Sequence, residues 1–282
     1  MCRLFAQLSA APTPARPYLA DSAYSLLRQS DADPKRPQKD GWGIAYFEGR
    51  RPVLVKSAGA ASKERRRFER EAEKVVSRSA VAHLRAASNP LGLPISKLIS
   101  KANSQPFTDG RVLFAHNGTL EIPLEVARTL GPLRRNLRSR NDSEVYFWQF
   151  IKHYRKTRDV AQALKLCVKE DWDLWRECRD KHPDKEKPYT SLNALIAEPT
   201  RLHAFCHAFR PKPARSLFTP GLPWTVMTFA RRDTRLLVSS EGLDRKPWKR
   251  LTPPALLTAD VDTGRLRVSV RELQLPLPRN PS

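Results

Sequence analysis

The sequence of 282 residues is poor in cysteine, glycine, acidic residues and long apolar runs, and each shortage excludes a class of protein. Four cysteines without a C-x-x-C pair are too few for a disulfide scaffold of this length, which indicates free thiols in a reducing compartment. No apolar run approaches the roughly 18 residues of a membrane span, and the amino terminus lacks the apolar core of a secretory signal. We therefore expect a soluble, cytoplasmic protein with no membrane partner.

The shortage of acidic residues makes the chain strongly basic. Its 51 Lys and Arg residues stand against 29 Asp and Glu residues, which gives a formal net charge of +22. Such a charge attracts polyanions, so a basic nucleic-acid-binding protein without catalysis is one function to weigh. The sequence has no recognised nucleic-acid-binding motif and no strip of aromatic residues interleaved with basic ones, which disfavours nucleic acid as a partner.

Short apolar runs predict strands at both ends of the chain and helices in its middle. We expect strands at 3–8, 43–47, 52–56, 80–85, 111–116, 192–197, 202–207, 236–240 and 266–270. We expect helices at 63–76, 122–130, 142–154 and 158–168. This order lacks a regular alternation of strand and helix, so it predicts an α+β domain with mostly antiparallel sheets.

Local patterns add four expectations. Asp142 or Ser143 is expected to cap the helix over 142–154, and the Asp-Thr-Gly sequence at 262–264 predicts a hairpin turn. The highly charged segment 171–190 is either a helix or a mobile excursion. Residues 276–282 are rich in proline and are expected to form a frayed tail.

Cys2 is the first candidate for chemistry, because it follows Met1 and precedes the first expected strand. A small side chain at this position predicts removal of Met1, which would leave a thiol and a free α-amine on one residue. An α-amine with a pKa of about 7.7–8.0 is a usable general base for the thiol beside it. The alternative is that Cys2 is an incidental small residue after the start.

The turn His116-Asn117-Gly118 is the second candidate. An Asn-Gly turn after a strand can present a backbone N–H and a side-chain amide on one side, as an oxyanion hole requires. Arg85, at a strand end, could bind a carboxylate through two hydrogen bonds. Asp142 could bind an ammonium group. The alternatives are an ordinary turn, a surface arginine and a helix cap.

The order of these motifs resembles the class II glutamine amidotransferases, which are N-terminal-nucleophile (Ntn) hydrolases. Along the chain stand Cys2, Asp40-Gly41-Trp42-Gly43, His83-Leu84-Arg85, Asn103-Ser104-Gln105-Pro106-Phe107, His116-Asn117-Gly118 and Asp142-Ser143-Glu144. The start Met-Cys-Arg-Leu-Phe-Ala is most similar to stand-alone bacterial members related to the ergothioneine-pathway γ-glutamyl hydrolase. The resemblance is good over 1–150 and weaker over 190–245.

The resemblance implies a four-layer αββα sandwich built from two mostly antiparallel sheets. It implies one amidotransferase domain over 2–275, with a charged insertion near 171–190. The chain after the last family strand, about 40 residues, is too short for the synthase domain that often accompanies this one.

The resemblance also assigns roles. It implies that Cys2 attacks the γ-carbonyl of a glutamyl group, with its own amine moving the proton. Asn117 and Gly118 would form the oxyanion hole, Arg85 would bind the substrate α-carboxylate, and Asp142 would bind the α-ammonium. Supporting roles would fall to four further residues, which are His116, Trp42, Gly43 and Asn103.

The expected function is hydrolysis of a γ-glutamyl amide through a cysteine thioester, with release of glutamate and ammonia or an amine. Either a separate synthase receives the ammonia, or the chain is a γ-glutamyl hydrolase of one metabolite conjugate. No metal or organic cofactor is implied. His203, Cys206 and His207 lack a fourth ligand at zinc spacing, so we expect them to pack or face solvent.

Overall fold

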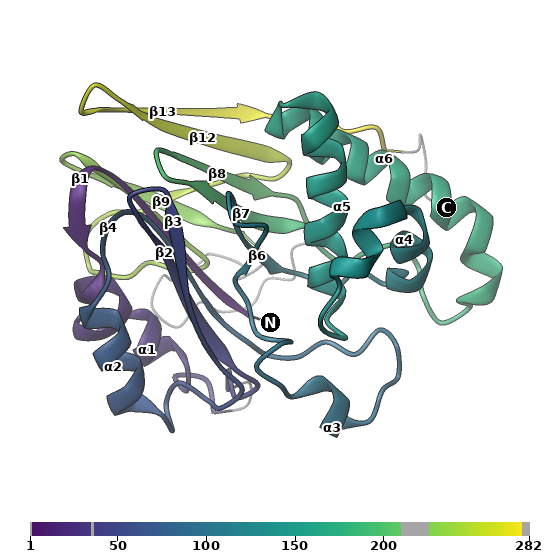
Figure 1. Cartoon of the computed structure of the whole chain (residues 1–282), viewed down its shortest axis with the longest axis horizontal. Helices are drawn as coiled ribbons and strands as arrows, with labels where there is room; N and C mark the ends of the chain where they lie inside the picture. Colours follow the sequence, from purple (N-terminus) through teal and green to yellow (C-terminus); the bar gives the residue numbers. More distant parts are fainter. Residues whose placement is uncertain (1, 35–36, 210–225, 278–282) are drawn as a thin grey trace.

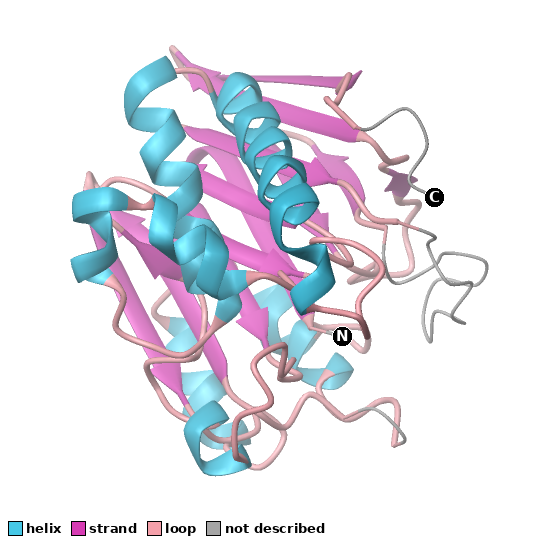
Figure 2. Cartoon of the chain, turned by 90° about the vertical axis from the view of Figure 1, so that its right-hand side faces the viewer, coloured by secondary structure: helices cyan, strands magenta, loops and turns pink. Residues whose placement is uncertain are grey.

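Two antiparallel sheets lie face to face and helices cover the outer face of each, so that the chain forms four layers (Figure 1, Figure 2). The computed structural model describes residues 2–34, 37–209 and 226–277. This arrangement confirms the expected α+β class and sandwich. Among the described residues, none of the helices combines the length and the apolar character that crossing a membrane requires.

The first sheet has seven strands and the second has six. The order in the first is β11 (Lys249–Arg250), β9 (Thr228–Arg232), β10 (Arg235–Ser239), β1 (Arg3–Pro14), β4 (Val76–Leu84), β2 (Trp42–Glu48) and β3 (Arg51–Ser57). The order in the second is β13 (Arg265–Glu272), β12 (Ala255–Asp262), β8 (Arg201–Cys206), β7 (Asn193–Glu198), β6 (Leu113–Asn117) and β5 (Phe107–Thr108). The first strand of the chain thus lies in the interior of its sheet, beside β4 and β10.

The helices divide between the two outer layers and the connections. They are α1 (Leu26–Gln29), α2 (Arg65–Glu73), α3 (Ile95–Leu98), α4 (Pro123–Thr129), α5 (Asp142–Thr157) and α6 (Val160–Cys178). Shorter turns are the π-helical η1 (Pro17–Asp21) and the 3-10 turns η2 (Gly131–Asn136) and η3 (Arg179–Lys181). In Figure 1, α1 and α2 cover the seven-stranded sheet, and α4, α5 and α6 cover the six-stranded sheet.

Side-chain alternation along the strands explains the layers. On β1, Leu4, Ala6 and Leu8 point into the core between the two sheets, whereas Phe5 points into the core beneath α2. On β6, Leu113 and Ala115 face the other sheet, and Phe114 packs against the aromatic side of α5. Both sheets are therefore buried on two faces, and their inner strands contain few exposed residues.

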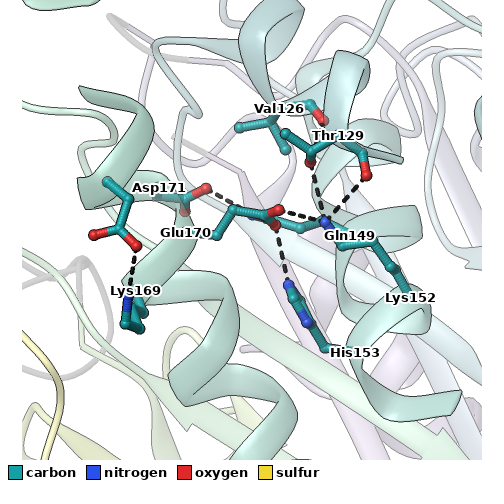
Figure 3. Close-up of polar contacts among 9 residues, drawn as sticks. Val126, Thr129, Gln149, Lys152, His153, Lys169, Glu170 and Asp171 are labelled. Carbon is teal, nitrogen blue, oxygen red and sulfur yellow. Dashed lines mark hydrogen bonds and ion pairs between the residues drawn. The ribbon is translucent and has the colours of Figure 1, made fainter. Parts of the chain in front are cut away.

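A largely buried polar cluster joins α5 to α6 (Figure 3). Glu170 forms an ion pair with Lys152 and accepts a hydrogen bond from His153 Nε2 at 3.0 Å. Gln149 Nε2 donates to Asp171 Oδ1 at 2.8 Å. Although burial opposes ionisation, these hydrogen bonds hold the pKa of Glu170 at about 2, whereas burial raises the pKa of Asp171 well above its usual range.

The structure corrects the expected cap of α5, shows that part of the segment 171–190 is helical and confirms the expected hairpin turn. Asn141, rather than Asp142 or Ser143, caps α5, because the Asp142 carboxylate bonds elsewhere. The first part of segment 171–190 is helical, since α6 continues to Cys178. The expected turn at 262–264 joins β12 to β13, with positive φ at Thr263 and Gly264. Residues 278–282 of the expected tail lie outside the described residues.

Candidate active site

Cys2 lies directly before β1, and its side chain is only 8% exposed. Its Sγ is 3.4 Å from both the backbone nitrogen and the carbonyl oxygen of Ala86, on the segment that leaves β4. Burial raises the pKa of the Cys2 thiol, while the Ala86 hydrogen bond and the charge of Arg85 act to lower it. The thiol therefore needs a nearby base to become a strong nucleophile.

Arg85 is buried beside Cys2 at the end of β4. Its Nη1 donates to the carbonyl oxygen of Leu98 at 2.7 Å and to that of Asp40 at 3.3 Å. Burial lowers the pKa of the guanidinium, and the negative groups of Cys2, Asp40 and Asp142 act to raise it. Two backbone carbonyls thus fix the orientation of a cation that lies within electrostatic range of both the thiol and Asp142.

Asp142 is the first residue of α5 and is also buried. Its Oδ2 accepts a hydrogen bond from Leu120 N at 2.8 Å, and its Oδ1 accepts one from Ser88 Oγ at 3.2 Å. Burial raises the pKa of this carboxyl to about 6, although both hydrogen bonds act to lower it. A desolvated carboxylate of this kind favours a cationic partner.

The turn after β6 is packed too tightly for any residue but glycine at position 118. A Cβ added to Gly118 would lie 1.9 Å from the carbonyl oxygen of Ser191 and 2.7 Å from His116 Nε2. The backbone N–H of Leu120 donates a hydrogen bond to the Asp142 carboxylate, so this turn is bonded directly to Asp142. The charge of the same carboxylate acts to raise the pKa of the Cys2 thiol.

His116 supports the same turn. Its Nδ1 lies 2.9 Å from Ser143 Oγ and its Nε2 lies 2.9 Å from the carbonyl oxygen of Ser191. Burial lowers the pKa of His116 to about 4, so the ring is neutral at pH 7. From these partners we assign the tautomer in which Nε2–H donates to Ser191 and Nδ1 accepts from Ser143. The ring links the turn to α5 and to the segment that precedes β7.

Asn103 connects the Arg85 side of the site to the Asp142 side. Its Nδ2 donates to the Leu98 carbonyl at 2.9 Å, which is the same carbonyl that receives Arg85. Its Oδ1 accepts Arg140 N at 2.9 Å, and its own carbonyl accepts Asn141 Nδ2 at 2.6 Å. The network therefore fixes the start of α5 relative to the guanidinium.

Trp42 and Gly43 lie on opposite faces of β2. Trp42 packs in the core beneath α2, where its Nε1 donates to Glu64 Oε2 at 2.8 Å and its ring meets Phe68 edge-on. A Cβ on Gly43 would lie 2.2 Å from the Gln105 carbonyl oxygen, so this glycine permits a close backbone approach. No contact of the described residues joins the Trp42 ring to Cys2.

Three contributors to the site were not anticipated. Asp40 Oδ2 accepts Ala87 N at 2.8 Å and thereby holds the segment that contacts Cys2. Ser88 holds Asp142, and the Ala86 backbone brackets the thiol. Asp40 begins the Asp-Gly-Trp-Gly motif and Ser88 lies three residues after Arg85, but side-chain type alone does not reveal hydrogen bonds between distant segments.

His203, Cys206 and His207 face different parts of the protein and do not form one cluster. Cys206 packs between the sheets, whereas His203 Nδ1 lies 3.2 Å from Thr258 Oγ1. His207 Nε2 contacts Tyr189 Oη at 3.0 Å on the helical side. These side chains are held by packing and hydrogen bonds, as expected.

Comparisons with known proteins agree with this geometry. The family of class II glutamine amidotransferases matches residues 1–218. A class II domain protein from Silicibacter pomeroyi is 18% identical, with a TM-score of 0.65 over 98% of this chain and 100% of its own. A glutamine amidotransferase from Pseudomonas aeruginosa is 18% identical, with a TM-score of 0.51 over 94% and 99%.

The glutamine phosphoribosylpyrophosphate amidotransferase of Bacillus subtilis also shares the fold. It is 15% identical, with a TM-score of 0.59, and the match covers 95% of this chain but 49% of that enzyme. A search of curated sequences gave no match. Because the family match extends over most of the chain, we conclude that this protein is a member of the class II glutamine amidotransferases.

Proposed function

We propose that the protein hydrolyses a γ-glutamyl amide with Cys2 as its amino-terminal nucleophile. The observation that carries the proposal is the meeting of a buried thiol, a buried guanidinium and a buried carboxylate at Cys2, Arg85 and Asp142. Opposite fixed charges suit the zwitterionic head of a glutamyl group. Arg85 would bind the α-carboxylate and Asp142 would bind the α-ammonium.

The nucleophile depends on removal of Met1. The α-amine of Cys2 would then accept the thiol proton as Sγ attacks the γ-carbonyl carbon. The developing oxyanion would be stabilised by the Asn117 side-chain amide and the Gly118 N–H. The same amine would protonate the departing ammonia or amine as the thioester forms. Water would then attack the thioester, release glutamate and regenerate the thiol.

We further propose that the enzyme acts as a stand-alone γ-glutamyl amide hydrolase, with a specific metabolite conjugate as its substrate. Support comes from the sequence after the nucleophile, Arg-Leu-Phe-Ala, which is similar to that of the stand-alone bacterial members. Delivery of ammonia from glutamine to a separate synthase is the other outcome. The substrates distinguish the two, because a hydrolase would prefer a conjugate with a larger leaving amine.

A glutamate-release screen tests the proposal. Glutamine and a panel of γ-glutamyl amides are incubated with the wild type, with Cys2→Ala and with Cys206→Ala, which removes a thiol from the core between the sheets. We expect release by the wild type and by Cys206→Ala, and none by Cys2→Ala. Release that survives in Cys2→Ala would overturn the nucleophile assignment.

A further inference from the structure

Three side chains of metal-binding type converge where the end of α6 meets α4. Glu125 of α4, Cys178 at the end of α6 and His182 after η3 place one ligand atom each within 4.8 Å of the other two. In Figure 1 this region lies in the outer helical layer. Cys178 and His182 fall in the charged segment 171–190, for which the amidotransferase chemistry gives no role.

The polar groups of this cluster are not satisfied by one another. Glu125 Oε2 is buried without a hydrogen-bond partner among the described residues. Glu125 Oε1 and His182 Nε2 are 3.4 Å apart, which is long for a hydrogen bond. A cation between the three groups would compensate both the carboxylate and a thiolate.

We propose that Glu125, Cys178 and His182 bind a zinc ion. Zinc accepts thiolate, imidazole and carboxylate ligands together, and a thiolate with a carboxylate neutralises its charge. Ligand atoms on one tetrahedral zinc ion lie about 3.4–3.6 Å apart, from bond lengths of about 2.0–2.3 Å. The 3.4 Å between Glu125 Oε1 and His182 Nε2 already fits this spacing. The distances to Cys178 Sγ are at most 4.8 Å, which exceeds the spacing by about 1.3 Å, a difference that side-chain rotation can cover. Water would fill the fourth position.

Neighbouring residues hold the ligands in place. The Trp175 ring stacks on the His182 ring, with 6.3 Å between centroids. Lys185 forms an ion pair with Glu121 at 3.0 Å and fastens the chain after η3 to the segment that precedes α4. The metal would therefore act as a clip that fixes the end of α6 and the following loop onto α4. None of the contacts of the described residues joins this cluster to Cys2, Arg85 or Asp142.

Cobalt titration of the chelator-treated full-length protein tests the site. Cobalt bound by a thiolate gives a ligand-to-metal charge-transfer band, so absorbance reports directly on the Cys178 ligand. We expect one cobalt ion per chain in the wild type and in Cys2→Ala, which removes the reactive thiol. Cys178→Ser should lose the band. His182→Gln should weaken binding by more than about 100-fold, since even outer-shell partners of a metal ligand are worth ~10–100-fold.

A thermal shift with zinc provides the second readout. Zinc should raise the melting temperature of the wild type and of the control His203→Gln, but not that of Cys178→Ser, because only a folded site binds the ion. Titration that shows no charge-transfer band in the wild type would overturn the proposal. An unchanged band in Cys178→Ser would overturn it as well.

Discussion

At the scale of single residues, the site is preorganised by backbone carbonyls and N–H groups. Arg85 is oriented by the carbonyls of Leu98 and Asp40, and Asp142 by the N–H of Leu120. The Cys2 thiol lies against the Ala86 backbone. Charges that are fixed in this way need little rearrangement when a substrate binds, which would favour a productive orientation of the γ-carbonyl in the proposed reaction.

Substitution of Arg85 by lysine should weaken substrate binding. An ammonium cannot make the two parallel hydrogen bonds of a guanidinium to a carboxylate. We expect Arg85→Lys to raise KM for glutamine or the preferred γ-glutamyl amide by about tenfold or more, with a smaller effect on kcat. Steady-state kinetics measures this, with the exposed Arg111→Lys as control. An unaltered KM in Arg85→Lys would exclude the assigned role.

The protonation state of Asp142 should steepen the acidic limb of the pH profile. Its folded pKa is raised to about 6, so the carboxylate that would bind an ammonium exists above pH 6 and is lost below it. We expect kcat/KM, which reports the free enzyme, to fall first as the Cys2 α-amine is protonated near its usual pKa of about 7.7–8.0, and to fall more steeply below about pH 6. Asp142→Asn should lower kcat/KM at neutral pH and remove only the steeper fall below pH 6. A steeper fall that persists in that variant would assign it to another group.

The candidate site residues could be predicted because they stand in short motifs with a fixed order. Asn117-Gly118, for example, is visible as a turn after an apolar strand. The contacts that position the site could not be predicted. Asp40 bonds to Ala87 and Ser88 bonds to Asp142 across long stretches of sequence, and such pairings depend on how the sheets pack.

At the scale of elements, nine predicted strands and four predicted helices correspond to elements of the structure. Four strands were missed, namely the two-residue strands β5 and β11 and the longer strands β9 and β12. β9 contains Thr-Phe-Ala-Arg-Arg, whose polar residues conceal its alternation. β12 follows Pro253-Pro254, and prolines are typical of loops rather than of strands. The hairpin turn predicted at 262–264 could have revealed β12. A hairpin turn joins two strands, so the strand predicted after the turn requires a partner strand ahead of the turn.

The polar cluster between α5 and α6 gives a prediction about stability (Figure 3). Burial raises the pKa of Asp171 in the folded protein well above its unfolded value near 3.8. Above pH 3.8 the carboxyl is ionised in the unfolded chain, so it must take up a proton when the protein folds. The free energy of unfolding therefore falls as pH rises. Asp171→Asn removes this requirement and supplies an amide donor close to Gln149. We expect a gain of about 1–3 kcal/mol in the free energy of unfolding at neutral pH.

Denaturant titration at several pH values checks this expectation. The gain in Asp171→Asn should be larger at pH 8 than at about pH 3, where the unfolded carboxyl is itself largely protonated. The partly exposed Asp173→Asn serves as the control, because Asp173 lies on the same helix with ion pairs to Lys169 and Arg176. A pH-independent loss of stability in Asp171→Asn would show that this carboxyl is ionised in the fold.

At the scale of the whole molecule, the charge of +22 is separate from the proposed chemistry, which uses one arginine. We expect binding to duplex DNA to depend on general charge alone. It should fall by about tenfold or more between roughly 50 and 200 mM salt, and it should be equal in the wild type and Cys2→Ala. Salt-resistant, sequence-selective binding in an electrophoretic or fluorescence assay would instead support a nucleic-acid function.

Covalent labelling tests the central claim most directly. A glutamine analogue with an electrophilic side chain is reacted with the protein, and intact mass and peptide mapping locate the adduct. The account predicts one equivalent of label on Cys2 of a chain that lacks Met1, and none in Cys2→Ala. Label on another cysteine, or active enzyme that retains Met1, would contradict the account.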